Sequence, residues 1–573
     1  MRRRLYLIIV ACLFTLPIVA QYDEKQILMQ QANQMMVQRQ YPQAEELFLQ
    51  ILEKFPNDQT SILQLAFMYL NISADLKAEE HIKKYQRQIP DKTFTELRIQ
   101  VLVLQGKLEE ANALADSYLA LYGSASNAYH MVAGYFTRRA AYDSAIRIYY
   151  LARQRHGDSI FALELANAAM QSQQYRLALE EYLRFMATQA NSNLFVKNQI
   201  INIVKEDSTM ITHFQQTMPV DNQIILEIYA SSLSAINRPA EALAIYQQLP
   251  STYLRDFAVE QMRQENFDLA RRAYRILAES SSVDHQRLSY KLDIARIYYN
   301  QADYDSAETV LTDLLADTFW GKNTQNKRNP LYVNIRKLYA QNALANGNDT
   351  DTVRTWLAET RQYATQNQEI QDLELEQARL AILSRDFEVA ERSLKSVNIP
   401  QLLDYRDYLR FMEAFLKKDS PMADSLMNEY IIRHPASQYA NDIIYLNMLA
   451  LAMNETQLGE FGEAVRLLQL FQPEGIDILA TLYEETKDEE LAILAIEWAL
   501  GLDETQKAEL LLAIEFQDEL AGEYAKMLSL ALMQDRDAEI DLAREFLKVK
   551  PNSIFSPRFR QVISRIGTTQ ISL

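Results

Sequence analysis

The chain has 573 residues, of which 12 are glycine and 14 proline, and its formal net charge at pH 7 is −18. So little glycine, against the usual ~7%, disfavours sheets and glycine-rich catalytic loops. The negative charge disfavours nucleic acid and anionic lipid as partners, although an acidic surface can also serve solubility alone. Hydrophobic residues make up 48% of the chain, enough for a continuous core. The composition therefore favours an all-helical chain with short turns.

Residues 1–20 are predicted to be a signal peptide. Arg2 to Arg4 precede the apolar run Leu5 to Leu16, and Ala20 offers a small residue for cleavage. The apolar run is too short for a convincing membrane span, so the order of segments is typical of an export signal. Cleavage there leaves a mature chain with no cysteine, no disulfide and no integral membrane span. In the alternative, the segment ending at Cys12 resembles the lipobox of bacterial lipoproteins, and Cys12 would carry a lipid anchor.

The next segment predicts a helical hairpin. Between Tyr41 and Pro56 the apolar residues, among them Ala44 and Phe48, recur at the i, i+3, i+4 and i+7 spacing of one helical face. Ala32 lies twelve residues before Ala44 on a preceding helix expected from Ile27 to Gln38. Small alanines at both places let the two helices approach closely. The unit is a hairpin of about 34 residues, a period that indicates a helical repeat.

The same frame recurs downstream. From Ala44, the alanines at 78, 111, 145 and 178 follow at steps of 34, 33, 34 and 33 residues. With this period and these small and aromatic positions, the sequence resembles the tetratricopeptide-repeat superfamily over nearly all of the mature chain. The positions expected to pack between helices are Ala32, Ala44, Phe48, Pro56, Ala66, Ala78, Ala133, Tyr142, Ala145, Tyr149, Ala166, Tyr175, Ala178, Tyr182, Ala242, Tyr246, Ala270, Tyr274 and Ala307.

The resemblance implies an all-α, right-handed superhelical solenoid of about 12–14 hairpin units, several of them degenerate. An N-terminal solenoid is expected over residues 21–320, with one degenerate unit at Leu194 to Pro219. Looser repeats are expected over residues 331–573. The last helix, Pro557 to Ile566, is expected to cap the stack, as the terminal repeat of a solenoid must.

The polar run Gly321 to Pro330 interrupts the repeats and is the strongest loop candidate. Pro330 suits the first turn of a helix, which we expect from Leu331 to Ala345. We predict that residues 321–330 are a hinge between the two halves of the solenoid. A plain surface loop and a binding loop are the alternatives.

The sequence offers no catalytic constellation. Its six histidines are scattered, and none has a His or Cys partner at metal-ligand spacing. His-Glu-x-x-His, glycine-rich phosphate loops and Gly-x-Ser-x-Gly are all absent from the sequence. Acidic pairs such as Glu45-Glu46, Glu109-Glu110 and Glu489-Glu490 lie on amphipathic helices, where a solvated face is expected. We therefore expect no enzyme activity, no catalytic or metal-binding residue and no cofactor.

The resemblance implies a protein-binding scaffold or adaptor, and the signal peptide places it in the periplasm or at the outer-membrane periphery of a Gram-negative bacterium. The partner is expected to be a protein or peptide held in the groove of the superhelix, not a nucleic acid. The alternative is a protein that binds glycan or peptidoglycan fragments, because 32 residues are tyrosine. Many of these tyrosines occupy repeat positions, however, where packing between helices is their expected role.

Overall fold

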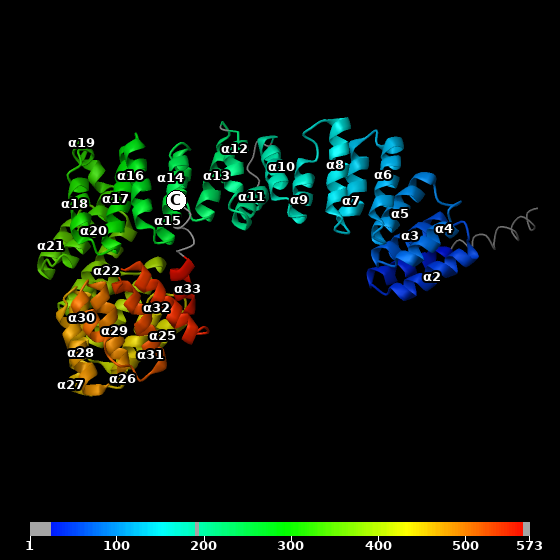
Figure 1. Cartoon of the computed structure of the whole chain (residues 1–573). Helices are drawn as coiled ribbons and strands as arrows, with labels where there is room; N and C mark the ends of the chain where they lie inside the picture. The colour runs from blue at the N-terminus through cyan, green and yellow to red at the C-terminus, as the bar shows by residue number, and fades with distance from the viewer. Residues whose placement is uncertain (1–23, 189–193, 220, 534, 565–573) are drawn as a thin grey trace, which may run out of the picture. The chain divides into compact units, whose positions relative to one another are not determined.

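The computed structural model describes residues 24–188, 194–219, 221–533 and 535–564 (Figure 1). Every regular element in these ranges is helical, and none of them is a strand. The chain divides into two compact units, Met1–Ile245 and Tyr246–Leu573, called unit 1 and unit 2 below. The predicted signal peptide, including Cys12, lies outside the described residues. None of the described helices is long and apolar enough to cross a membrane.

Unit 1 begins with a helix over residues 24–37. The helices that follow are α2 (Tyr41–Lys54), α3 (Gln59–Asn71), α4 (Asp75–Lys84), α5 (Asp91–Leu104), α6 (Leu108–Tyr122), α7 (Ser126–Thr137), α8 (Tyr142–His156), α9 (Ala162–Gln171), α10 (Tyr175–Thr188), α11 (Leu194–Glu206), α12 (Met210–Thr217), α13 (Gln223–Ala235) and α14 (Pro239–Tyr246). Neighbours in the sequence pack together as hairpins, and the predicted degenerate unit is the pair α11 and α12.

Unit 2 has the same construction. Its helices are α15 (Ser251–Arg263), α16 (Phe267–Ser280), α17 (Asp284–Asn300), α18 (Tyr304–Leu315), α19 (Phe319–Lys322), η1 (Thr324–Arg328), α20 (Pro330–Ala345), α21 (Thr350–Arg361), α22 (Asn367–Leu383), α23 (Phe387–Ser396), η2 (Pro400–Leu402), α24 (Leu403–Leu416), α25 (Ser420–Arg433), α26 (Ala440–Leu451), α27 (Glu455–Gln469), α28 (Glu474–Thr486), α29 (Glu489–Gly501), α30 (Thr505–Leu512), α31 (Glu519–Ser529), η3 (Leu530–Leu532), α32 (Arg536–Val549) and α33 (Ser556–Ser564). The predicted all-α helical solenoid is confirmed.

Tight turns close the hairpins with a residue in the left-handed conformation. Arg39 has φ 58°, and the amide of Gln40 donates a 2.9 Å hydrogen bond to the carbonyl of Met35. Ala140, with φ 57°, ends α7 in the same way. This is the left-handed cap that usually takes glycine, because glycine has no Cβ to clash. The chain makes most of these turns with other residues, so its low glycine content does not mean that tight turns are missing.

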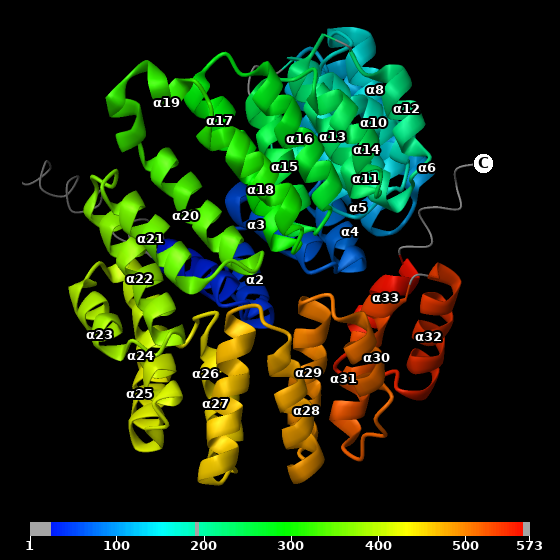
Figure 2. The ribbon, with the colours of Figure 1, turned by 90° about the vertical axis from the view of Figure 1, so that its left-hand side faces the viewer.

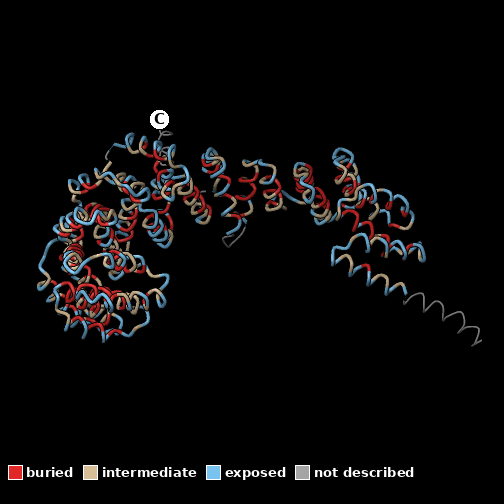
Figure 3. Tube along the Cα trace, turned by 90° about the horizontal axis from the view of Figure 1, so that it is seen from below, coloured by how far each residue is buried: buried red, intermediate tan, exposed pale blue. Residues whose placement is uncertain are grey.

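The repeat positions expected to pack between helices lie mostly in the core. All the alanines among them have no exposed surface, and Phe48, Tyr149, Tyr182, Tyr246 and Tyr274 are also buried. Tyr142 and Tyr175 are half-buried at the first positions of α8 and α10. Pro56 is exposed just beyond the end of α2. In Figure 3 the buried residues recur along every hairpin, so the core runs with the chain.

The polar segment 321–330 is folded into short helical turns. Before it, the buried indole of Trp320 donates a 2.7 Å hydrogen bond to the carbonyl of Leu314. Most of the segment itself is the 3-10 helix η1. Asn329 then caps α20 by accepting a 2.9 Å hydrogen bond from the amide of Leu331. The division of the chain at this segment, as a hinge, stays a prediction.

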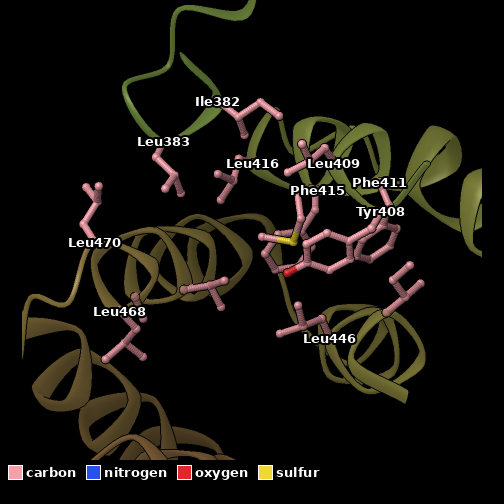
Figure 4. Packing of buried hydrophobic residues seen from close by; sticks show 14 of the residues in the cluster. Ile382, Leu383, Tyr408, Leu409, Phe411, Phe415, Leu416, Leu446, Leu468 and Leu470 are labelled. Atoms are coloured by element: carbon pink, nitrogen blue, oxygen red, sulfur yellow. The ribbon is translucent and has the colours of Figure 1, made fainter. Parts of the chain in front are cut away.

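A single hydrophobic core connects most of unit 2. It extends from Val333 in α20 to Ala525 in α31. Figure 4 shows its central part, where Phe411 and Phe415 of α24 lie among leucines of the neighbouring helices. The last hairpin, α32 and α33, has a small core of its own around the stacked rings of Phe546 and Phe559.

Candidate functional site

Helices α20, α22, α24, α26, α29 and α31 of unit 2 form one continuous face, which we call the first-helix face. Figure 2 shows these helices following one another in chain order. Side chains link each helix to the next: Lys337 pairs with Asp372, Tyr405 and Tyr408 stack on Tyr439, Tyr445 donates to Glu490, and Tyr524 donates to Glu497. Helices α22 and α24 are in direct contact. The face therefore presents an unbroken row of aromatic and charged side chains.

The upstream part of this face is aromatic and balanced in charge. Arg379 Nε lies 3.2 Å from Glu376 Oε2, and Gln341 donates a 2.8 Å hydrogen bond to the same carboxylate. Burial alone would lower the pKa of the Arg379 guanidinium, but the charge of Glu376 raises it above its usual value. Burial, with the charge of Glu376, raises the pKa of Tyr405 well above its usual value. The cation is thus held by a carboxylate of its own helix, and both groups keep their ordinary charge.

The downstream part is a groove lined by α26, α29 and α31, with a volume of about 700 Å³, which we call the acidic groove. Two of its apolar residues are strongly exposed, Met448 at 63% and Leu520 at 54%. The ring of Phe555 stacks on Tyr524 with centroids 5.2 Å apart. The full lining is Asn441, Asp442, Ile444, Tyr445, Met448, Glu490, Ile493, Glu497, Leu520, Ala521, Tyr524 and Phe555.

Helical spacing explains why these residues meet. Glu490, Ile493 and Glu497 follow one another at i, i+3 and i+7, which places all three on one face of α29. The N-terminus of α29 is fixed in turn, because Asp488 accepts a 3.1 Å hydrogen bond from the amide of Glu490. Glu489 accepts hydrogen bonds from two backbone amides of the segment before α31, at 2.6 and 2.9 Å. These contacts hold α31 beside α29 and define the groove.

Three carboxylates of the groove carry its charge. Tyr445 Oη donates a 2.9 Å hydrogen bond to Glu490 Oε2, and Tyr524 Oη donates a 2.5 Å bond to Glu497 Oε1. Burial raises the pKa of Asp442. Burial also raises the pKa of Glu497, and the charges of Glu490 and Asp442 add to the effect, while the bond from Tyr524 opposes it. Ionisation of the groove is therefore held back by burial and by repulsion between its own carboxylates.

The sequence did not single out these residues. It predicted a solvated face for Glu489 and Glu490, whereas the structure ties Glu489 to backbone amides and places Glu490 in the groove. None of the repeat positions expected to pack between helices lines the groove. The only signal in the sequence was the spacing of acidic and aromatic residues along single helices. Over the residues that the structure describes, no three His, Cys, Asp or Glu side chains are grouped to hold a metal ion.

No protein-family model and no curated protein matches the sequence. Two solved structures align along the chain. The structure of Naa15/Naa10 bound to HypK-THB is 11% identical, with a TM-score of 0.24, and the alignment covers 96% of this chain and 98% of that one. The APC/C hetero-tetramer Cut9-Hcn1 is 14% identical, with a TM-score of 0.25 and coverage of 94% and 96%. At such low scores no function is transferred from either protein.

Proposed function

We propose that this chain is a non-enzymatic scaffold that holds a segment of a partner protein on the first-helix face of unit 2. The observation that carries the proposal is the acidic groove, where exposed Met448 and Leu520 lie together with charged and aromatic side chains. Contiguous exposed apolar surface rimmed by polar residues marks interaction sites in soluble proteins. A groove that crosses three successive helices suits a segment laid along the repeats.

Glycan binding is the alternative function, and the tyrosines give it less support. A sugar would need a free aromatic face. In the upstream part of the face, Tyr439 stacks on Tyr408 at 4.6 Å and on Tyr405 at 5.4 Å between ring centroids. These rings cover one another, as expected for packing between helices.

We further propose that the chain is exported and acts in the cell envelope of a Gram-negative bacterium. The basic, apolar and small-residue segments of residues 1–20 support this proposal. Cell fractionation with N-terminal sequencing tests it: a mature chain that begins at Gln21 is expected. A chain that begins at a lipid-modified Cys12 would instead establish the lipoprotein alternative, and a full-length chain in the cytoplasm would contradict export.

Photo-crosslinking tests the scaffold proposal. Benzoylphenylalanine replaces Met448 in the groove or, as the control, Ile432 of α25, which is 82% exposed and outside the first-helix face. After irradiation in extract of the source cells, one protein should be joined through a defined peptide at position 448 and not at position 432. The same adducts at both positions, or none at position 448, would contradict the proposal.

A further inference from the structure

We propose that the acidic groove takes a positively charged segment of the partner. A lysine or arginine side chain meets Asp442, Glu490 and Glu497, and an apolar side chain of the same segment packs on Met448 and Leu520. The inference rests on the proposed function, because it names the chemistry of the segment that the first-helix face holds.

The first step is the imbalance of charge along the face. In its upstream part the acidic groups have cations of their own, since Arg379 pairs with Glu376 and Lys337 with Asp372. In the groove, no lysine or arginine of the described ranges forms an ion pair with Asp442, Glu490 or Glu497. The nearby Lys550 pairs with Glu523 at 3.1 Å instead. The groove therefore lacks the counterion that the rest of the face supplies for itself.

The second step is the fixed geometry of the carboxylates. Tyrosine hydroxyls hold one oxygen each of Glu490 and Glu497. An ionised carboxylate has about four acceptor positions, so both groups keep capacity for the donors of an ammonium or guanidinium group. The rings of Tyr445 and Tyr524 line the same groove and offer faces that attract a cation. A cation bound here would also relieve the repulsion that raises the pKa of Glu497.

The third step is the apolar lining. Ile444, Met448, Ile493, Leu520 and Phe555 surround the carboxylates. The aliphatic stem of lysine or arginine packs on such surface while its charged end reaches the carboxylates. An acidic peptide would be repelled, and a sugar would leave the apolar residues uncovered. A peptide that alternates basic and apolar residues satisfies both parts of the groove.

The test uses the full chain and three fluorescein-labelled peptides of about ten residues, long enough to span three helices 8–10 Å apart. One peptide alternates lysine with leucine, the second glutamate with leucine, and the third lysine with serine. Fluorescence anisotropy at low salt should give the tightest binding for the lysine–leucine peptide. The glutamate–leucine peptide should not bind, and the lysine–serine peptide should bind more weakly because it leaves Met448 and Leu520 uncovered.

Isosteric variants separate the groove from the general acidity of the chain. The groove variant D442N/E490Q/E497Q keeps every acceptor that the tyrosines use and removes three charges. The control E46Q/E484Q/E485Q removes three exposed charges elsewhere. The dissociation constant of the lysine–leucine peptide should rise at least about tenfold in the groove variant. In the control it should rise less than about twofold, since distant surface charges are screened.

Three outcomes would overturn the inference: no binding to the wild-type chain, equal loss in both variants, or equal binding of the glutamate–leucine peptide. Helical circular dichroism of each variant shows that it is folded, and the single variant E497Q, which should weaken binding in the same direction, replaces the triple variant if that one unfolds. Crosslinking at position 448 that persists while the peptides fail would leave the scaffold proposal standing and reject only the basic segment.

Discussion

At the scale of single residues, Gly475 shows how closely two helices of unit 2 approach. It lies at the start of α28, where a Cβ would stand 2.7 Å from the carbonyl oxygen of Ala464 and 2.6 Å from Leu468 Cγ in α27. The backbone oxygen cannot move aside as a flexible side chain could. Glycine is therefore required here by packing against α27.

The substitution Gly475→Ala should destabilise unit 2 by about 1–3 kcal/mol, because the added methyl forces α27 and α28 apart. The matched control is Gly501→Ala at the end of α29, where nothing lies within 4 Å of the added Cβ. The control should be neutral or slightly stabilising, since alanine favours helix more than glycine does. Thermal melting followed by circular dichroism measures both, and equal melting temperatures would contradict the close approach.

Glu497 predicts a dependence of stability on pH. Its pKa is raised in the folded chain, so the folded state binds the proton more tightly than the unfolded state does. The resulting stability is fully present below the unfolded pKa of about 4.3 and is lost as pH rises through the folded pKa. Glu497→Gln removes this loss. The melting temperature of the variant relative to wild type should therefore rise between pH 4 and pH 8, with the exposed Glu484→Gln as a flat control, and a difference that falls with pH would contradict the burial of the charge.

At the scale of elements, the hairpin turns carry strain that the sequence can relieve. A residue with a side chain in the left-handed conformation is disfavoured by about 1–2 kcal/mol. Ala140 adopts this conformation in an exposed turn between α7 and α8. Eleven other residues with side chains have similar φ angles in short turns at helix ends, namely Arg39, Ser73, Gln173, Asn237, Glu265, Ala302, Arg385, Lys418, Phe471, Lys487 and Asp503.

Ala140→Gly should stabilise this hairpin by about 0.5–1 kcal/mol, the relief of strain less the extra freedom of glycine in the unfolded chain. The matched control is Ala113→Gly at an exposed position inside α6, where glycine should cost about 1 kcal/mol. Native-state hydrogen exchange resolves the effect in α7 and α8 without requiring the whole chain to unfold as one unit. Faster exchange of α7 and α8 in Ala140→Gly would contradict the strained turn.

The sequence predicted the helical class of the fold because its signal is local. An alanine such as Ala145, buried where two helices meet, stands in the same register with its own hairpin and with the next one. The groove depends on Asp442, Glu490 and Glu497, which belong to α26 and α29 and come together only through the packing of a degenerate stretch of repeats. The turns were equally hidden, since alanine, arginine and phenylalanine do not announce a left-handed conformation.

At the scale of the whole molecule, the sequence predicts that the chain is cut most easily within residues 321–330. Solenoid stability is close to a sum of nearest-neighbour terms, so an interruption between units should open first. Limited digestion with trypsin should cut first at Lys322, Lys327 or Arg328, and mass spectrometry identifies the fragments. A first cut at Arg238 or Arg255, on either side of the boundary between units 1 and 2, would contradict the hinge and favour that boundary instead.

Binding on the first-helix face is tested most directly by hydrogen–deuterium exchange of the full chain with and without the lysine–leucine peptide. Bound peptide covers the groove and stabilises the helices that line it, so amides of α26, α29 and α31 should exchange more slowly. Exchange in α25 and α28, which lie outside the first-helix face, should change little. Protection confined to α25, α28 or unit 1, or a bound peptide that leaves α26, α29 and α31 unchanged, would contradict the assignment of binding to this face.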